Sequence, residues 1–177
     1  MKKLKTKILL GLVFLLIVIF LLSTTGIFSI YYLSEDSKAI IKDNYASVEH
    51  STRMLDAIEN IFTLQLSRLE NANKDTALVK AINDSLQNKK EEFVKYLGYQ
   101  KNNITESGED KIVSNVIDSY HRFINVIDSI NYQADNFNTY DVDKLKSSYI
   151  TATSSIEEIY KLNMTAIYNK NAVANKT

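Results

Sequence analysis

The sequence predicts an all-α protein in which an N-terminal transmembrane helix continues into an up-down-up-down antiparallel four-helix bundle. Three observations support this prediction: a long apolar stretch near the N-terminus, apolar residues recurring at spacings of three and four, and few turn residues. The 177 residues include no proline, no cysteine and only four glycines. Sandwiches and barrels need many tight turns rich in glycine and proline, so this composition favours long helices with few connections.

The apolar stretch covers residues 8–33, and no charged residue lies between Lys7 and Glu35. As a helix it would be about 39 Å long, enough to cross a hydrocarbon core of about 30 Å. Residues 1–7 contain four lysines and no acidic residue. Basic flanks stay in the cytoplasm, so we expect residues 1–7 to be cytoplasmic and residues 34–177 to be extracytoplasmic.

A cleaved signal peptide is the alternative interpretation of this stretch. Residues 8–22 could form its apolar core, and the small residues from Ser23 to Gly26 could follow it. However, the apolar run resumes at Ile27, and no A-x-A cleavage motif is present. The pattern therefore favours an uncleaved anchor; cleavage would instead produce a secreted helical bundle.

Polar breaks divide the remaining chain into four expected helices, which are residues 34–71, 76–102, 108–135 and 141–177. Thr105 or Ser107, followed by Glu109 and Asp110, is expected to begin the third helix, because acidic residues favour the first turn. Short connections between long helices predict antiparallel neighbours in an up-down-up-down bundle.

Each expected helix has one apolar seam. The seam expected in residues 34–71 contains Ile41, Tyr45, Val48, Leu55, Ile58, Phe62, Leu66 and Leu69. Polar residues interrupt the four seams at Thr52, Lys89, Asn131 and Asn163. Polar groups at such positions can fix helix register and oligomeric state, or mark a bundle that slides between two arrangements.

The basic start at Lys2 to Lys7, the apolar span and the four seams ending near Thr177 resemble the extracytoplasmic four-helix-bundle sensor region of bacterial transmembrane signalling proteins. Histidine kinases and chemotaxis receptors are the particular examples. The resemblance implies a region that senses a signal and transmits it across the bacterial inner membrane, with its bundle in the periplasm. It also implies a homodimer, a small-molecule or protein signal, and a second membrane helix beyond Thr177.

The resemblance favours a two-component sensor histidine kinase as the parent protein, with the ligand-binding domain of a chemotaxis receptor as an alternative. A membrane-anchored coiled-coil scaffold with no sensing role is the alternative from another class. Any catalytic part of a kinase would lie outside these residues.

The sequence contains no pattern that indicates catalytic, cofactor or metal chemistry. His50 and His121 are the only histidines, and neither has a second histidine or a cysteine at ligand spacing, so we interpret both as helix-surface residues. The serine-rich pieces, such as Ser147–Ser148 and Ser154–Ser155, have no histidine nearby that could activate them, and no glycine-rich loop could bind phosphate. The chain beyond the apolar stretch is mildly acidic, which argues against a nucleic-acid surface.

The three arginines, Arg53, Arg68 and Arg122, are the candidate ligand-binding residues. A guanidinium group can hold a carboxylate or phosphate with two parallel hydrogen bonds, which lysine cannot do. All three arginines flank apolar seams, where they could line a groove between helices and bind an anionic signal. Alternatively, they cover the seam with their aliphatic parts and keep their charges in water.

Overall fold

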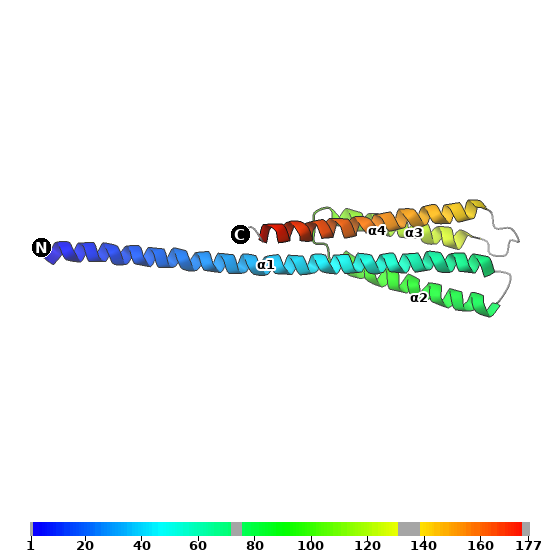
Figure 1. The fold of residues 1–177 in the computed structure, drawn as a ribbon, viewed down its shortest axis with the longest axis horizontal. Helices are drawn as coiled ribbons and strands as arrows, with labels where there is room; N and C mark the ends of the chain where they lie inside the picture. Colours follow the sequence, from blue (N-terminus) through cyan, green and yellow to red (C-terminus); the bar gives the residue numbers. More distant parts are fainter. Residues whose placement is uncertain (1, 72–75, 131–138, 175–177) are drawn as a thin grey trace. The chain divides into compact units, whose positions relative to one another are not determined.

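The computed structural model describes residues 2–71, 76–130 and 139–174. Its four long helices are α1 (Lys2–Asn71), α2 (Thr76–Lys101), α3 (Glu109–Ser129) and α4 (Thr139–Ala174), and the described residues include no strand (Figure 1). The predicted all-α class is therefore confirmed. Long helices form here because no proline interrupts them and apolar residues recur at helical spacing.

The chain divides into two compact units, Met1–Ile40 and Ile41–Thr177. In the first unit, Leu9–Tyr31 is a 23-residue segment of α1 that is long and apolar enough to cross a membrane. The hydroxyls of Thr24 and Thr25 donate to backbone carbonyls one turn earlier, at 2.9–3.1 Å. These bonds satisfy the hydroxyls within their own helix.

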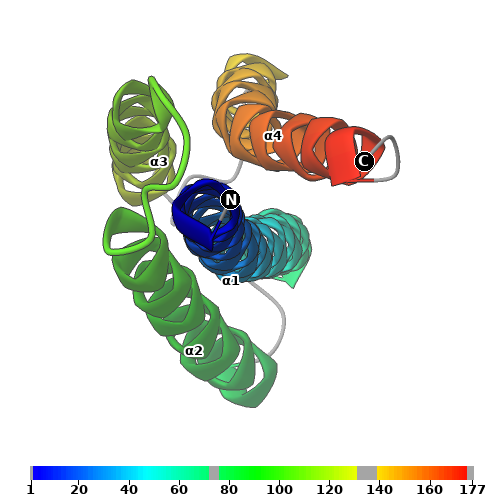
Figure 2. The ribbon, with the colours of Figure 1, turned by 90° about the vertical axis from the view of Figure 1, so that its left-hand side faces the viewer.

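The second unit, here called the helical unit, is built from residue 41 onward by α1 to α4. In Figure 2, the four helices surround a common centre: α1 lies beside α2 and α4, and α3 lies across from α1, between α2 and α4. Aromatic rings mark three of the contacts: Phe62 stacks on Tyr149 at 4.3 Å between centroids, Phe93 stacks on Tyr120 at 3.9 Å, and Phe123 meets Tyr149 at 6.3 Å. The α1–α2 pair is marked by an ion pair of 3.6 Å between Asp56 and Lys89.

The apolar core of the helical unit comes from all four helices. Fully buried apolar side chains include Ile58 and Ile61 from α1, Phe93 from α2, Phe123 from α3, and Ile156 from α4. Because each helix buries one stripe at spacings of three and four, the unit needs no sheet or disulfide to form a core. The seams predicted for α2, α3 and α4 supply most of this core.

The seam predicted for α1 is wrong in its first half, and in its second half only Ile58 and Leu69 are buried, while Leu55, Phe62 and Leu66 pack against the core at its edge. Tyr45 is 53% exposed, whereas the structure buries the polar residues Asn44, Ser47 and Ser51. The buried stripe is therefore rotated by about one residue from the apolar one. Hydrogen bonds that these polar side chains make, described below, compensate for the loss of water.

The polar residues that interrupt the predicted seams have different environments. Lys89 remains partly exposed and forms ion pairs with Glu92 at 2.7 Å and with Asp56. The hydrogen bond to Glu92 raises the Lys89 pKa, and this effect outweighs the opposite effect of burial. Thr52 is exposed and donates to the Val48 carbonyl. Asn163 is fully buried. Asn131 lies outside the described residues.

The start of α3 lies where the sequence predicts it, with Glu109 and Asp110 in the first turn, but the capping residue differs from the prediction. Gly108 is the N-cap residue at φ +83°, a left-handed conformation that favours glycine, and no side chain caps the helix from that position. Instead, the Glu109 carboxylate accepts hydrogen bonds from the backbone N–H groups of Thr105 and Glu106. Neither Thr105 nor Ser107 is the cap.

The end of α3 also differs from the prediction, because the helix ends at Ser129 rather than at residue 135. Ile130 has extended backbone angles and its N–H bonds to the Ile127 carbonyl, while its side chain remains in the core. The chain therefore turns away from the helix at a residue that is still anchored by burial.

Replacing Phe93 tests the aromatic packing of the core. We expect Phe93→Ala to lower the free energy of unfolding by about 3–5 kcal/mol, because it removes a fully buried ring that stacks on Tyr120. Chemical denaturation of the full chain in detergent micelles, followed by circular dichroism, measures this loss. The neighbouring Val94 is 56% exposed, so Val94→Ala is the matched control and should change stability by less than about 0.5 kcal/mol. Equal effects of the two variants would contradict the assigned core.

Candidate functional site

A group of buried and partly buried polar side chains, here called the polar cluster, links the four helices of the helical unit. Its members come from the early part of the unit's α1 segment, the end of α2, the 102–108 connection, the start of α3 and the later part of α4. They are Asn44, Ser47, Gln100, Asn103, Thr105, Glu106, Glu109, Asn163 and Lys170.

The Glu109 carboxylate is the centre of the polar cluster and is fully buried. One oxygen, Oε1, accepts from Gln100 Nε2 at 2.9 Å and from Asn163 Nδ2 at 2.6 Å. The other oxygen, Oε2, accepts from the backbone N–H groups of Thr105 at 2.7 Å and Glu106 at 3.1 Å. Four N–H donors thus match the four lone-pair positions of an acceptor-only carboxylate, and they come from α2, α4 and the connection before α3.

The Thr105 hydroxyl lies between three acceptors on three different helices. Its Oγ1 is 2.5 Å from Asn44 Oδ1 on α1, 3.1 Å from Asn163 Oδ1 on α4, and 3.2 Å from Glu109 Oε2 on α3. A hydroxyl has one hydrogen to donate, so it can satisfy only one of these acceptors at a time. Thr105 is therefore a hydrogen-bond donor for which α1, α3 and α4 compete.

Glu106 and Lys170 form an ion pair at the edge of the polar cluster, and Asn44 Nδ2 donates to the same carboxylate oxygen at 2.9 Å. Burial alone raises the pKa of Glu106, but the hydrogen bonds and charge of Lys170 together with Asn44 outweigh it and lower that pKa. The pair ties the end of α4 to the connection between α2 and α3, and through Asn44 to α1.

Ser47 joins α1 to α2 and to the 102–108 connection. Its Oγ accepts from Gln100 Nε2 at 3.1 Å and from Asn103 Nδ2 at 2.9 Å, and it donates to the Asn103 carbonyl at 3.2 Å. Asn103 Nδ2 also donates to the Asp43 carbonyl. These bonds explain why α1 buries a serine at this level rather than the nearby Tyr45.

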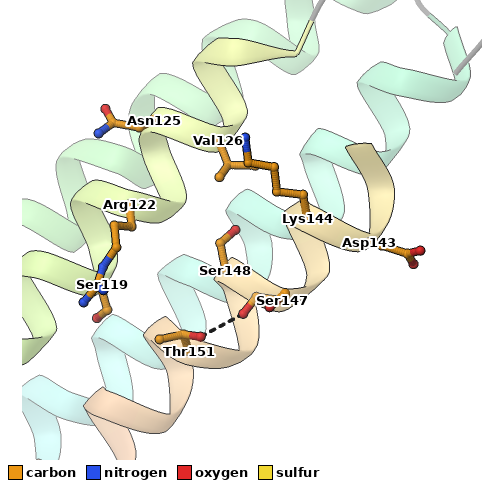
Figure 3. A pocket seen from close by; sticks show the side chains of 9 residues that line it. All are labelled: Ser119, Arg122, Asn125, Val126, Asp143, Lys144, Ser147, Ser148 and Thr151. Carbon is orange, nitrogen blue, oxygen red and sulfur yellow. Dashed lines mark hydrogen bonds between the residues drawn. The ribbon is translucent and has the colours of Figure 1, made fainter. Parts of the chain in front are cut away.

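A groove between α3 and α4 is the second candidate site. Its volume is about 520 Å³, within the range of small-molecule sites. In Figure 3, Arg122 lies on the α3 side and Lys144 reaches from α4 toward Val126, whereas Asp143 points away. The rest of the lining is mainly short and uncharged: Ser119, Asn125, Ser147, Ser148 and Thr151.

The groove therefore combines two cationic side chains with short polar ones. The hydroxyls of Ser119, Ser148 and Thr151 donate to carbonyls of their own helices, so their oxygens face the groove mainly as acceptors. Arg122 Nε donates to the Asp118 carbonyl of its own helix at 3.2 Å, which holds the side chain along α3. Lys144 is exposed, as is Arg122. This chemistry suits a small anion, since a guanidinium group binds carboxylate or phosphate oxygens.

The three predicted arginines do not converge on one site. Arg122 lines the groove, whereas Arg53 is exposed on α1 and Arg68 is partly buried near the end of α1. Neither α1 arginine lines the groove described here. The sequence thus led to one residue of the groove and did not identify Lys144.

The two histidines also differ from each other. His121 is exposed, as predicted for a helix-surface residue, but His50 is half-buried, with ring centroids 6.2 Å from Tyr96 and 5.6 Å from Tyr99. Burial lowers the His50 pKa, and the opposing effects of Glu49 and Gln100 do not offset it. Among the described residues, no group of three or more His, Cys, Asp or Glu side chains could hold a metal ion.

The sequence analysis did not predict the polar cluster. A usable signal was present, since Asn44, Ser47 and Ser51 recur at helical spacing and define a polar stripe. Such a stripe normally faces solvent, and only its partners in the 102–109 region explain its burial. Comparison with protein-family models, with curated proteins and with solved structures found no match.

Replacing Glu109 tests the polar cluster. We expect Glu109→Ala to lower the free energy of unfolding by about 2–4 kcal/mol, because it leaves several buried donors without an acceptor. Asp110 is the adjacent, exposed acidic residue, so Asp110→Ala removes the same charge and should cost less than about 1 kcal/mol. Denaturation of both variants in micelles measures the difference, and a Glu109→Ala variant as stable as the unmodified chain would contradict the assigned cluster.

Proposed function

We propose that this chain is the signal-sensing and transmembrane signal-transducing region of a bacterial receptor. The observation that carries the proposal is the polar cluster, which connects α4 to α1 through Thr105, Glu106 and Glu109. Since α1 also contains the apolar segment Leu9–Tyr31, a change in the position of α4 would alter the hydrogen bonds made by the helix that enters the membrane.

The proposed topology is an up-down-up-down antiparallel four-helix bundle. Two pairs of residues on α1 and α4 support it. Asn44 of α1 and Asn163 of α4 both contact Thr105, and Phe62 of α1 stacks on Tyr149 of α4. The order of partners is therefore opposite on the two helices. The same reversal holds for α1 and α2, where Ser47 meets Gln100 and Asp56 meets Lys89.

In this proposal, residues 1–7 are cytoplasmic, Leu9–Tyr31 crosses the inner membrane and the helical unit is periplasmic. The four lysines before the apolar segment support this orientation. A two-component sensor histidine kinase is the proposed parent, because the basic start, apolar span and four helices resemble the sensor regions of such proteins. A chemotaxis receptor would use the same elements with a different output.

The proposed receptor is a homodimer. Support comes from exposed apolar side chains of the helical unit, among them Tyr45 on α1 at 53% and Met164 and Tyr168 on α4 at 38% and 73%. Surfaces of this kind are enriched where chains associate.

The proposed signal is a small anion that binds in the α3–α4 groove. Arg122 and Lys144 supply positive charge from the two opposing helices, and Asn125 supplies a neutral amide donor. A ligand that contacts both helices would favour one spacing of α3 and α4 over another, which is the differential affinity that a conformational response requires.

Binding of citrate and of sulfate to the full chain in micelles tests this assignment. We expect both anions, at millimolar concentration, to shift the backbone amide signals of Ser148 and Thr151 in nuclear magnetic resonance spectra. Arg122→Gln should weaken binding at least about tenfold, because it removes the guanidinium from the groove. Arg53→Gln is the matched control, since Arg53 is an exposed arginine outside the groove.

Two results would contradict the anion site: no shift with either probe, or equal weakening by Arg122→Gln and Arg53→Gln. In that case the membrane-anchored scaffold without a sensing role would be the better interpretation of the helical unit.

Reporter fusions test the proposed orientation. Alkaline phosphatase fused after Thr177 should be active in a Gram-negative host and green fluorescent protein fused there should be dark, because the positive-inside rule places the helical unit outside the cytoplasm. Replacing the four lysines in residues 1–7 with glutamine is the matched control and should reduce this asymmetry. An inactive phosphatase fusion together with a fluorescent green fluorescent protein fusion would contradict the proposed extracytoplasmic location of the helical unit.

A further inference from the structure

Two buried polar atoms beside the polar cluster have no hydrogen-bond partner. They are His50 Nδ1 on α1 and Gln100 Oε1 on α2. Leaving a buried acceptor unpaired is costly, and two such atoms on facing residues indicate a hydrogen bond that one proton would complete. Gln100 Nε2 donates to Ser47 Oγ, about one turn before His50 on the same side of α1, so the amide lies next to the histidine. In agreement with this, hydrogen bonding to Gln100 raises the His50 pKa.

Gln100 connects His50 to the centre of the polar cluster. While its Oε1 faces the histidine, its Nε2 donates to Glu109 Oε1 at 2.9 Å and to Ser47 Oγ at 3.1 Å. Glu109 Oε1 in turn accepts from Asn163 Nδ2 on α4. A single amide therefore separates a half-exposed imidazole from a fully buried carboxylate that is bonded to α4.

The charged and titratable groups around His50 come from three helices. Glu49, on α1, favours the protonated ring, and Gln100, which donates to Glu109 on α3, does so through its side chain. On α2, the Tyr96 and Tyr99 rings flank the imidazole, and the Lys95 ammonium lies 5.6 and 5.9 Å from those two ring centroids. Lys95 opposes protonation, whereas the faces of aromatic rings attract a cation.

We propose that His50 is a proton-sensing residue whose Nδ1–H donates to Gln100 Oε1, so that protonation of the ring is transmitted through the Gln100 amide to Glu109 and to α4. The proton from solvent binds at Nε2, because the ring is half exposed and Nδ1 is the buried nitrogen. An imidazolium is a stronger donor than a neutral imidazole, and hydrogen bonds in a chain strengthen one another. Acidification outside the membrane is therefore the stimulus that this element would detect.

The sign of the effect on stability follows from the direction of the pKa. Burial lowers the His50 pKa below its ordinary value of 6.5, so the folded chain binds this proton less readily than the unfolded chain. The stabilisation associated with neutral His50 is complete above pH 6.5 and declines as the pH falls through the folded pKa. Glu106 responds in a separate window below pH 4.5, since its pKa is lowered.

A pH titration of the full chain in detergent micelles by nuclear magnetic resonance tests the proposal. The ring signals of His50 and the side-chain amide signals of Gln100 and Asn163 are followed from pH 8 to 4.5. We expect the amide signals of both residues to shift with the same midpoint as the His50 ring. His121 is exposed on α3, so His121→Gln is the control variant and should leave the transitions of those amide signals unchanged.

Three variants separate transmission from local effects. In Gln100→Met and in Glu109→Gln, His50 should titrate at a lower pH than in the unmodified chain, because the acceptor or the negative charge has been removed. In His50→Phe, which keeps a ring between Tyr96 and Tyr99, the Asn163 amide should lose its transition. Either of two results would contradict the proposal: an Asn163 amide shift that does not change across the His50 transition of the unmodified chain, or an Asn163 transition that persists in His50→Phe. Both results are independent of whether the groove binds an anion.

Discussion

The burial of the Glu109 carboxylate is the constraint on which the arrangement of the helical unit depends. A carboxylate removed from water is tolerated only where protein donors replace its hydration. Here the donors come from Gln100, Asn163 and the backbone of the 102–108 connection. Their simultaneous contact requires α2, α3 and α4 to meet at one level. Gly108, at φ +83°, allows the chain to turn back so that Glu109 can reach the backbone before it.

The buried polar residues of α1 differ in whether they have hydrogen-bond partners, depending on their position along the helix. Asn44 and Ser47 are fully buried and hydrogen-bonded to other segments. Gln65, also fully buried, has no hydrogen-bond partner for either amide atom. Unpaired buried amide atoms cost free energy, whereas paired ones help to specify one register. The hydrogen bonds of the polar cluster therefore fix the register of α1 against the other helices, whereas Gln65 contributes no such bond.

Periodicity and composition were sufficient to predict the all-α class, the apolar segment and most of the core of α2 to α4, because long apolar stripes without proline allow few other structures. They were insufficient for α1, where the apolar stripe containing Tyr45 was a better helical pattern than the polar stripe that the structure buries. Burial of Asn44 depends on Glu106 and Thr105, more than fifty residues away in sequence. A local pattern contains no information about such partners, and for the same reason Lys144 was not paired with Arg122.

The groove and the polar cluster share the same two helices, which gives the proposed receptor a physical route between them. Thr151 lines the groove and Asn163 bonds to Glu109, and both lie on α4, separated by about 18 Å along the helix axis. A helix transmits an axial displacement along its length, so a change in α4 at the groove alters the Asn163–Glu109 and Asn163–Thr105 distances. Each hydrogen bond to a charged group contributes about 1.5–3 kcal/mol, which lies within the range of coupling free energies typical of allosteric proteins, about 1–3 kcal/mol. One or two bonds of the polar cluster are therefore enough to couple the proposed anion site to α1.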